Sequence, residues 1–481
     1  MRKPTLLLAA LLGAAAPVAS AESLLQFYDA ALRSNPDYLI REFGVDQARA
    51  QRDIATSRLL PQVSVSANYS RNNFNDDFNA DRYSGLRAAV QVRQALVDLA
   101  SYFRLQGARA NVLQSKHLRA AARMAVGGEV IDRYLLVLQT ADEVQYLDAE
   151  KQATRSEIAR LRLMRERQLV KVTDLLEVEA YYQELLTNEI QARADNQVAL
   201  EQLRETSGLD AREAAPLART DFDPIEGDAD AWVASAAENN GTLIALQHGI
   251  SAARSLLRST RSEHLPQVAI IGSQVNSDQG VDNRQSPEFD VGSIGVQVTI
   301  PLYEGGRVSG SVEEARARWE IARQQYEQAW RQVARETRTA WLAASASHAR
   351  VGSSGEEVRA LERVVDAQRK SYQLGVSTIV DVLVAQRRLL RARFDQSRAR
   401  YDFIRALATL KVRAGNLGDG DVLRIDSWMR NTPLDGSTPD GNPVDGGPGD
   451  GGVPATPQAT RSARHRRSGR SRSCRQRRQA R

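Results

Sequence analysis

The most regular apolar pattern in the chain lies between Ser371 and Leu417. After a short turn at residues 374–377, neither proline nor glycine occurs until Gly415. Large apolar side chains recur there at helical spacing in two adjacent rows: Val382, Leu389, Phe403 and Leu410 form one, and Ile379, Leu383, Leu390, Phe394, Tyr401 and Ile404 form the other. A helix with two apolar rows packs against neighbours on both sides. The pattern therefore predicts a long helix set into a wall of helices.

Four other stretches alternate apolar and polar residues, which is the pattern of a strand with one apolar face. They form two predicted hairpins, residues 62–93 and 267–301. The apolar positions are Val63, Val65, Ala67 and Tyr69, then Leu86, Ala88, Val90 and Val92, and in the second hairpin Ile294, Val296, Val298 and Ile300. The sequence predicts short strands, with a polar turn from Asn72 to Arg82 in the first hairpin.

Long helical stretches follow each hairpin. Residues 100–167 contain no proline, and at about 1.5 Å per residue they would form on the order of 100 Å of helix. A turn near residues 168–172 leads into a second predicted helix, residues 174–206. Shorter helices are expected at residues 23–33 and 37–60, on either side of Asn35-Pro36.

The same series of elements occurs twice. Four sequence matches keep a nearly constant offset of 205 to 207 residues: Leu60-Pro61-Gln62-Val63 with Leu265-Pro266-Gln267-Val268, Val90-Gln91-Val92 with Val296-Gln297-Val298, Ala108-Arg109-Ala110 with Ala315-Arg316-Ala317, and Asp174 with Asp381. Self-similarity of this length indicates a tandem duplication. We divide the chain into a signal peptide (1–21), a first repeat (22–210), a connector (211–228), a second repeat (229–417), a C-terminal segment (418–432) and a tail (433–481).

The N-terminus has the features of a secretory signal peptide. Arg2-Lys3 precedes the apolar run Leu6–Ala16, and Ala19-Ser20-Ala21 forms a small-residue cleavage site. We expect the mature chain to begin at Glu22; an uncleaved membrane anchor is the alternative. No cysteine follows the cleavage region, which disfavours a lipid-anchored lipoprotein.

The rest of the chain offers only strands for spanning a membrane. No later run reaches about eighteen apolar residues, the length that a spanning helix needs. A sheet in a membrane must close on itself, and closed barrels need at least about eight strands. Four strands cannot close alone, so the sequence predicts an oligomer.

Composition narrows the possible chemistry. Cys474 is the single cysteine, which excludes an intrachain disulfide, and the five histidines match no metal-binding motif. The formal net charge of +6 is concentrated in the tail, where ten arginines lie between residues 461 and 481. The remaining body is therefore not a nucleic-acid binder by charge. The tail, rich in Pro, Gly and Asp before its arginines, is expected to be disordered and solvated; contact with lipopolysaccharide, acidic lipid or nucleic acid is the alternative.

Two motifs resemble one family. Ser371–Leu383, SYQLGVSTIVDVL, together with Arg400-Tyr401-Asp402-Phe403, is similar to the inner hairpin turn of the TolC family of bacterial outer-membrane channel-tunnels. Pro301-Leu302-Tyr303-Glu304-Gly305-Gly306 resembles the family's strand-to-helix turn. A phosphate-binding role for Gly305 and Gly306 is disfavoured, because no phosphate-loop motif accompanies them. The resemblance extends from Ser23 to Trp428.

This resemblance implies a mainly α fold with a small β part. Three chains would form a homotrimer with a 12-stranded outer-membrane β-barrel, continued by a periplasmic α-helical tunnel with an equatorial domain around its middle. The implied location is the bacterial outer membrane, in contact with its lipid and extending into the periplasm. The implied partners are a periplasmic adaptor (membrane fusion) protein, an inner-membrane ABC transporter and a secreted protein substrate. It implies no catalysis, cofactor, metal or nucleic acid.

Residues of the periplasmic entrance follow from the same resemblance. Asp381 matches an aspartate that lines the entrance, and three copies would form a ring of carboxylates that attracts cations. Read from the residues alone, Asp381 could equally be a helix N-terminal residue that the helix dipole favours. Val384 stands where the family has a second aspartate.

A latch at this entrance is also implied. Tyr372 matches a tyrosine that helps hold the entrance closed, and Asp174 matches its partner on the outer hairpin. Ser377 stands where the latch has an arginine, which puts the family's salt bridge in doubt. Replacement of that arginine by Lys171, Arg165 or Arg167 is a hypothesis.

We expect the exit duct of a type I secretion system, which would pass an unfolded protein, for example an extracellular protease, to the outside. The alternative is the outer-membrane channel of a multidrug efflux pump; many of these are lipoproteins, which disfavours it. A soluble periplasmic coiled-coil scaffold is a third hypothesis, but it would have no use for matched strand hairpins. An enzyme is the least favoured class, since no catalytic constellation is present.

Overall fold

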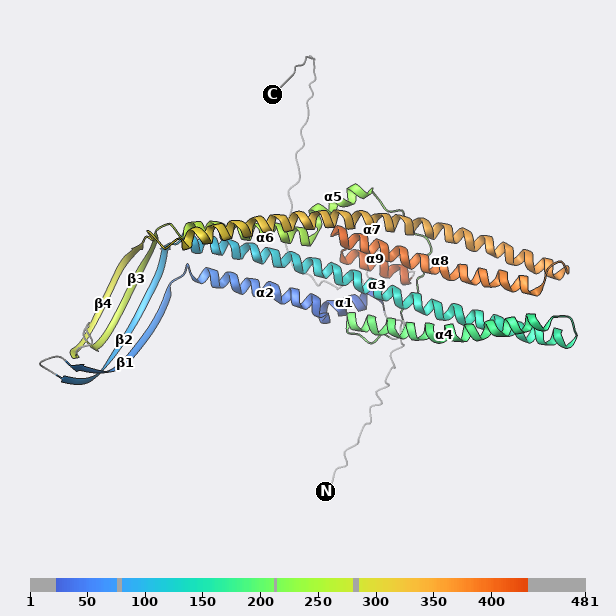
Figure 1. Ribbon diagram of the computed structural model, residues 1–481, viewed down its shortest axis with the longest axis horizontal. Helices are drawn as coiled ribbons and strands as arrows, with labels where there is room; N and C mark the ends of the chain where they lie inside the picture. The colour runs from blue at the N-terminus through green and yellow to red at the C-terminus, as the bar shows by residue number, and fades with distance from the viewer. Residues whose placement is uncertain (1–22, 76–79, 212–213, 280–284, 431–481) are drawn as a thin grey trace, which may run out of the picture. The chain divides into compact units, whose positions relative to one another are not determined.

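The computed structural model describes residues 23–75, 80–211, 214–279 and 285–430. The predicted signal peptide, the loop ends of both hairpins and the tail lie outside these residues. The elements in chain order are α1 (Leu24–Ser34), α2 (Pro36–Ser57), β1 (Gln62–Asn75), β2 (Ala80–Val97), α3 (Leu99–Glu166), α4 (Val172–Ser207), α5 (Ala229–Asn239), α6 (Gly241–Ser262), β3 (Gln267–Gln279), β4 (Gln285–Thr299), α7 (Arg307–Gln373), α8 (Ile379–Ala414) and α9 (Asp419–Arg430) (Figure 1).

The order helix, helix, strand, strand, long helix, helix occurs twice along the described chain. The long helices α3 and α7 have 68 and 67 residues, and α4 and α8 have 36 residues each. The predicted long helix at 100–167 is confirmed, although Gly127 and Gly128 lie within it. A Cβ at Gly128 would come within 2.8 Å of the Val412 side chain, so glycine permits a close approach of α3 and α8 here.

The four strands form one antiparallel sheet in the order β1-β2-β3-β4, and the β2–β3 pairing joins the two repeats. They have 14, 18, 13 and 15 residues, so the prediction of short strands is wrong. The predicted turn is also too long, because Asn72 pairs with Tyr83 and Asn73 with Arg82 inside the ladder. Ladder hydrogen bonds join backbone groups, so polar residues continue a hairpin beyond its apolar part.

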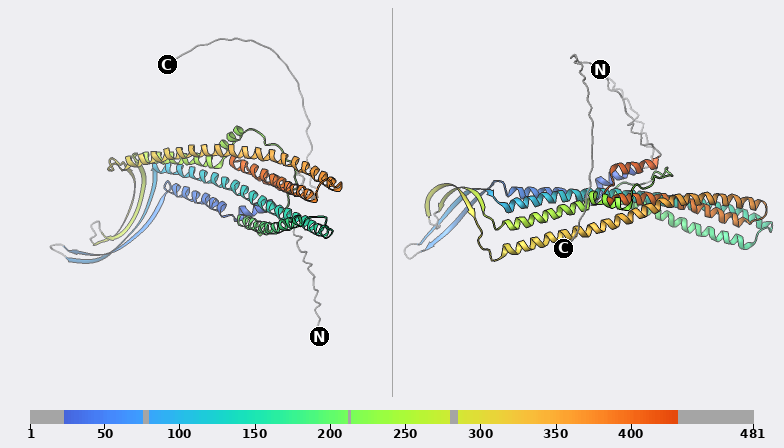
Figure 2. Two further views of the ribbon diagram at one scale, coloured as in Figure 1. Left: turned by 45° about the vertical axis from the view of Figure 1, so that its right-hand side comes forward. Right: turned by 90° about the horizontal axis from the view of Figure 1, so that it is seen from above.

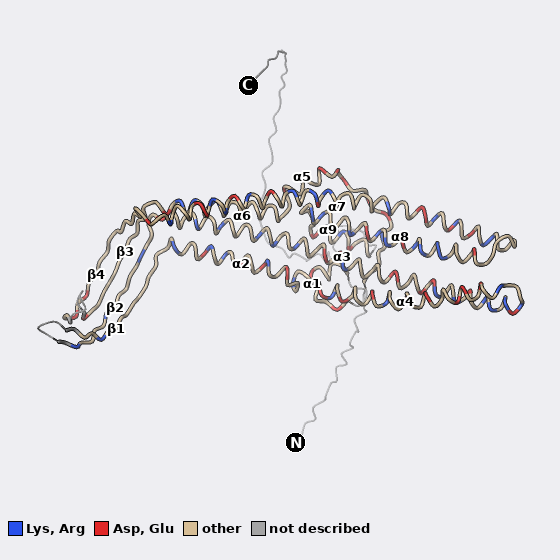
Figure 3. Tube along the Cα trace, viewed as in Figure 1, with Lys and Arg blue, Asp and Glu red and all other residues tan. Residues whose placement is uncertain are grey.

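One face of this sheet exposes apolar side chains. Val63 and Val65 of β1 lie opposite Val92 and Val90 of β2, and Val65 is 74% exposed. On β4, Ile294 is 84% exposed. Figure 3 shows few charged residues along the strands, whereas both signs of charge are spread over the helices. An exposed apolar surface flanked by polar residues marks a contact surface.

Within the described chain, none of the helices has the length and apolarity that crossing a membrane requires.

Neighbouring long helices pack side by side and run antiparallel (Figure 2). α3 contacts α2, α4, α6 and α8, and α7 contacts α5, α6 and α8. Both predicted apolar rows of α8 are confirmed as packing surfaces: Phe403, Ile404 and Leu410 are at most 1% exposed, and Leu389 and Leu390 are half-buried.

A central core gathers where α1, α3, α4, α8, α9 and the segment before α5 meet. Its largest buried side chains include Phe27, Tyr134 and Phe403. Backbone bonds also close it, since the Trp428 carbonyl accepts from the N–H groups of Ala218 and Arg219. α9 is therefore an integral part of the folded body.

Removing the tail should leave this body intact. A stop codon in place of Asn431 follows the last residue of α9, so the free energy of unfolding of the assembly is expected to lie within about 0.5 kcal/mol of that of the full chain. The measurement is thermal stability, with migration as an oligomer on gels before boiling. A stop codon at Asp419 is the matched control. It removes buried Val422, Ile425 and Met429 and should prevent folding. Loss of the oligomer in the first variant would show that the tail is structural.

Candidate functional site

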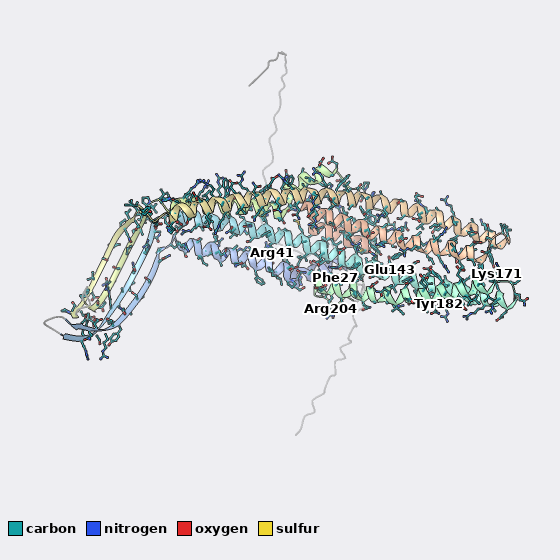
Figure 4. The ribbon with its side chains drawn as sticks, in the orientation of Figure 1. Phe27, Arg41, Glu143, Lys171, Tyr182 and Arg204 are labelled. Atoms are coloured by element: carbon teal, nitrogen blue, oxygen red, sulfur yellow. The ribbon has the colours of Figure 1, made fainter. Side chains whose placement is uncertain are left out.

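Two turns close the helical hairpins far from the sheet in sequence and structure. One joins α3 to α4, where Figure 4 labels Lys171, and the other joins α7 to α8. Buried apolar side chains from both hairpins form one group, here called the tip cluster: Ile158, Leu161, Leu175, Val178, Ile379, Val382 and Leu383. The two predicted halves of the entrance are thus brought together within one chain.

Left-handed residues shape both turns. Gly375 has φ of 73°, and its N–H donates to the Tyr372 carbonyl at 3.0 Å. Gln168 adopts φ of 60°, which is uncommon for a residue other than glycine. Its N–H donates to Arg165, and the next N–H, of Leu169, reaches the Met164 carbonyl at 2.9 Å. These bonds end the preceding helices and reverse the chain direction.

Asp381 is the third residue of α8 and lies exposed beside its N-terminus. Its Oδ2 accepts from the Thr378 N–H at 2.8 Å and from the Thr378 hydroxyl at 2.7 Å, while Thr378 Oγ1 accepts from the Asp381 N–H. These bonds form a capping box and lower the pKa of Asp381. The hydrogen bond from the Thr378 hydroxyl contributes most, and the bond from its N–H comes next. The carboxylate is therefore ionised and fixed in position. Its place in a ring around an entrance stays a prediction.

Asp174 occupies the matching position of α4 in the first repeat, but its surroundings differ. It is half-buried, and the hydroxyl of Thr173 lies 3.3 Å from its Oδ1. The residue before the helix is Lys171, which makes no side-chain capping bond. Both repeats therefore have an aspartate at the third position of the helix. Only Asp381 of α8 is held by a capping box; Asp174 of α4 is not. The role of Asp174 as a latch partner stays a prediction.

Tyr372 lies in the last turn of α7, half-buried against the tip cluster. The guanidinium carbon of Arg160, from α3, lies 5.4 Å from the centre of the Tyr372 ring. A cation over an aromatic face is attracted to it, so this pair links the two hairpins. Sequence reasoning missed Arg160, because the contact joins residues more than two hundred positions apart.

The other residues predicted for the latch are Ser377, Arg165, Arg167 and Lys171, and within the described chain none of them forms a hydrogen bond or cation–π contact with Tyr372. Ser377 donates its hydroxyl to the Gln368 carbonyl at 3.4 Å, so it helps close the α7–α8 turn. Arg165, Arg167 and Lys171 are exposed. Their substitution for the family's arginine stays a hypothesis, and Arg160 is the cation that the structure places against Tyr372.

Polar contacts above the tip also join the hairpins. Tyr401 of α8 donates to Asp142 of α3 at 2.7 Å. Nearer the tip, Tyr181 of α4 donates to buried Glu150 of α3, and the guanidinium carbon of Arg387 lies 3.5 Å from the Tyr181 ring centre. Burial is the main cause that raises the pKa of Tyr181, so its hydroxyl stays protonated and donates. These links show that the hairpin interface is held by polar as well as apolar contacts.

The strand-to-helix turn lies at the other end of α7. Pro301 follows β4 by two residues, and Gly305 and Gly306 have φ of 61° and 85°. Arg307, the first residue of α7, pairs with Glu304 and with Glu263. Leu302 and Tyr303 project outward and are 93% and 88% exposed. The two glycines connect β4 to α7 through positive φ angles, at which a side chain with a Cβ would be strained.

We predict a pH-dependent stability at the α3–α8 contact. Burial outweighs the hydroxyl bonds of Tyr401 and Ser397 and raises the pKa of Asp142. A carboxyl with a raised folded-state pKa stabilises the fold when protonated, and this contribution is lost as pH rises from 3.8 through the folded value. Asp142→Asn keeps an acceptor for Tyr401 and should raise stability near pH 7 by about 1 kcal/mol.

Thermal melts of wild type and Asp142→Asn at pH 4.5 and 7.5 test this. The stability advantage of the variant over wild type should shrink at the lower pH. A wild-type protein that becomes relatively more stable than the variant as pH rises would contradict the assigned sign.

The site around the two turns thus combines the fixed carboxylate of Asp381 with non-covalent contacts between the two hairpins, such as that of Arg160 with Tyr372. Among the residues that the structure describes, no group of three or more His, Cys, Asp and Glu side chains is placed to hold a metal ion.

Comparison with known proteins supports a transport role. The family model described as outer membrane efflux protein matches residues 27–209 and 232–416. The chain is 28% identical to outer membrane protein TolC of Vibrio cholerae, covering 88% of this chain and 98% of that protein. It is 27% identical to alkaline protease secretion protein AprF of Pseudomonas aeruginosa, covering 84% and 86%, and 25% identical to proteases secretion protein PrtF of Dickeya chrysanthemi, covering 91% and 98%.

Solved structures show the same fold. The Campylobacter jejuni CmeC outer membrane channel superposes with a TM-score of 0.71 at 16% identity, covering 86% of this chain and 90% of that one. The outer membrane protein VceC of Vibrio cholerae gives 0.70 at 16% identity, covering 82% and 96%. The two repeats, the strand hairpins and the long helical hairpins are thus a known channel fold. The chain belongs to the outer membrane efflux protein family, the TolC family, and is a transport protein of the bacterial outer membrane.

Proposed function

We propose that this protein is the exit duct of a type I secretion system, a conduit without a catalytic step. It would take an unfolded protein, such as an extracellular protease, from an inner-membrane ABC exporter and a periplasmic adaptor. The observation that carries this proposal is the near full-length similarity to two relatives named for protease secretion, of which the chain covers 86% and 98%.

The sheet supports a trimer. β1 and β4 are its two edges, and their outer backbone groups have no partner strand among the described residues of this chain. In hydrocarbon such edges must be paired, which neighbouring copies would do by joining β4 of one to β1 of the next. Paired apolar positions from Val63 to Tyr69 cover roughly 20 Å at about 3.3 Å per residue, close to the apolar band of a membrane barrel.

The turns at the ends of the two helical hairpins support the proposal that an adaptor protein binds at the entrance. Around the turns, Leu169 is 67% exposed, and Leu374 and Val376 are 79% and 80% exposed. Exposed apolar side chains grouped at two neighbouring turns are typical of a surface that binds another protein. Behind them Asp381 would supply the carboxylate ring, while Tyr372 and Arg160 would hold the hairpins in the closed arrangement.

Drug or solvent efflux is the second candidate. A solvent efflux pump outer membrane protein, SrpC of Pseudomonas putida, is 22% identical to this chain and is covered over 85% of its length. The two hypotheses differ in cargo and not in architecture, so the fold alone does not separate them.

Deletion of the gene in its own host separates these candidates. Under the secretion hypothesis, at least one protein should fall about tenfold or more in the culture supernatant and accumulate in the cells. Sensitivity to small toxic compounds should change little. The gene restored on a plasmid is the control. Increased drug sensitivity with an unchanged set of secreted proteins would favour the efflux function instead.

A further inference from the structure

Two histidines from different repeats lie side by side in the helical wall. His117 is on α3 and His248 on α6, their ring centres are 5.2 Å apart, and their planes differ by 18°. Both side chains are half-buried. Neither belongs to the entrance, the strand-to-helix turn or the apolar face of the sheet.

Close packing of α3 and α6 holds this pair together. A Cβ at Gly241 would come within 2.8 Å of the His117 carbonyl oxygen, and one at Gly249 within 3.2 Å of Gln114 Nε2. The backbone thus approaches its neighbour on both sides of the histidines. Because the two helices are fixed at this short distance, the imidazoles remain adjacent without any bond between them.

The matching positions of the two repeats do not carry a second histidine pair. At the offsets of 205 and 207 residues, His248 corresponds to Phe43 and His117 to Gln324. Phe43 carries no metal-ligating atom and Gln324 only a weakly ligating amide. The histidine pair therefore occurs once in the described chain, at the contact that joins the repeats.

We propose that His117 and His248 form a chelating site for a divalent transition-metal ion of the Cu²⁺, Ni²⁺ or Zn²⁺ type. Imidazole nitrogen is a preferred ligand of these ions. Two imidazoles bound at about 2.0–2.1 Å to one tetrahedral ion have ring centres roughly 5 Å apart, which fits the observed separation. The nearly parallel rings must rotate about their Cβ–Cγ bonds for both nitrogens to face one ion, and this torsion is soft.

The surroundings of the two histidines favour reversible binding of the metal ion. An imidazole binds a metal ion through the nitrogen that carries no proton, so each ring ligates in its neutral form. No third His, Cys, Asp or Glu joins the pair within the described residues. Gln114, beside Gly249, and water would complete the coordination, so the ion exchanges more readily than one with four protein ligands. A bound ion would tie α3 to α6, and hence the first repeat to the second.

Copper binding to the purified full-length assembly tests this site. Cu²⁺ is titrated into wild type, His117→Gln and His248→Gln, with equilibrium dialysis for stoichiometry and electron paramagnetic resonance for nitrogen ligands. His264→Gln, an exposed histidine beyond α6, is the matched control. His465 and Cys474 are present in every variant, so differences between variants report His117 and His248. Melting without metal checks that each variant is folded.

The expected result is one Cu²⁺ per chain with a two-nitrogen signal from these residues. Affinity should fall by about tenfold or more in each single variant and remain unchanged in His264→Gln. Copper should also raise the melting temperature of wild type more than that of either variant. Wild-type affinity and an unchanged nitrogen signal in His117→Gln or His248→Gln would overturn the proposal. This outcome is independent of the protein's cargo.

Discussion

Asp381→Asn is expected to weaken the block of the open channel by a trivalent cation by about ten- to a hundredfold. In the proposed trimer three Asp381 carboxylates would converge at the periplasmic entrance. Charges gathered in a narrow, partly dehydrated pore attract a multivalent cation far more strongly than single surface carboxylates do. Asparagine retains an oxygen that accepts from Thr378, so the α8 cap is kept while the charge is removed. Single-channel recording in a planar bilayer, with the cation on the periplasmic side, measures the block.

Two matched variants make this test specific. Val384→Asp restores the second carboxylate that the family pattern predicts and should tighten the block, since Val384 is one turn from Asp381 and partly exposed. Tyr372→Phe keeps the ring that Arg160 contacts but removes the hydroxyl that the proposed latch would join to Asp174. It should therefore raise conductance, and it should not change cation affinity because the Asp381 carboxylates remain. Unchanged block in Asp381→Asn would mean that Asp381 does not line the entrance.

Phe403→Ala is expected to destabilise the folded body by about 3–5 kcal/mol. The Phe403 side chain is 1% exposed in the central core. Its ring centre lies 5.1 Å from that of Phe222 and 5.3 Å from that of His348, so truncation removes aromatic contacts from both the connector and α7. Helices α8 and α9 would then face a cavity that their neighbours cannot fill.

Denaturant unfolding of the purified assembly measures this loss. Phe403→Leu fills most of the space and should cost less than about 1.5 kcal/mol. Thr409→Ala, exposed on the same helix, should change the free energy of unfolding by about 0.5 kcal/mol or less. A Phe403→Ala protein as stable as the Thr409→Ala control would show that the central core does not depend on this ring.

Local patterns predicted most of the secondary structure because they act over one or two turns. The two adjacent apolar rows of α8, whose residues recur at helical spacing, are buried or half-buried as expected. Gly375 and Gly415, which bound the helix in sequence, have φ of 73° and 75°. Strand lengths were underestimated, since the polar residues around Asn72 pair through their backbone and leave no apolar alternation to read.

The contacts between hairpins did not follow from local pattern. Tyr401 and Asp142 are 259 residues apart in sequence. The contact of Arg160 with Tyr372 and the stacking of His117 on His248 also join distant segments. Periodicity places each residue on a helix face, but the rotation and offset of two packed helices depend on how side chains fit along the whole interface.

The sequence by itself determined that the chain is exported, duplicated and built from strand hairpins and long helices, because these depend on composition, repetition and local hydrogen bonding. It also indicated the family through the two motifs at the ends of α7. Only the tertiary structure decided which cation meets Tyr372 and that two histidines of different repeats are neighbours. Each of these depends on the distance between helices, which is fixed by packing summed over many residues far apart in the chain.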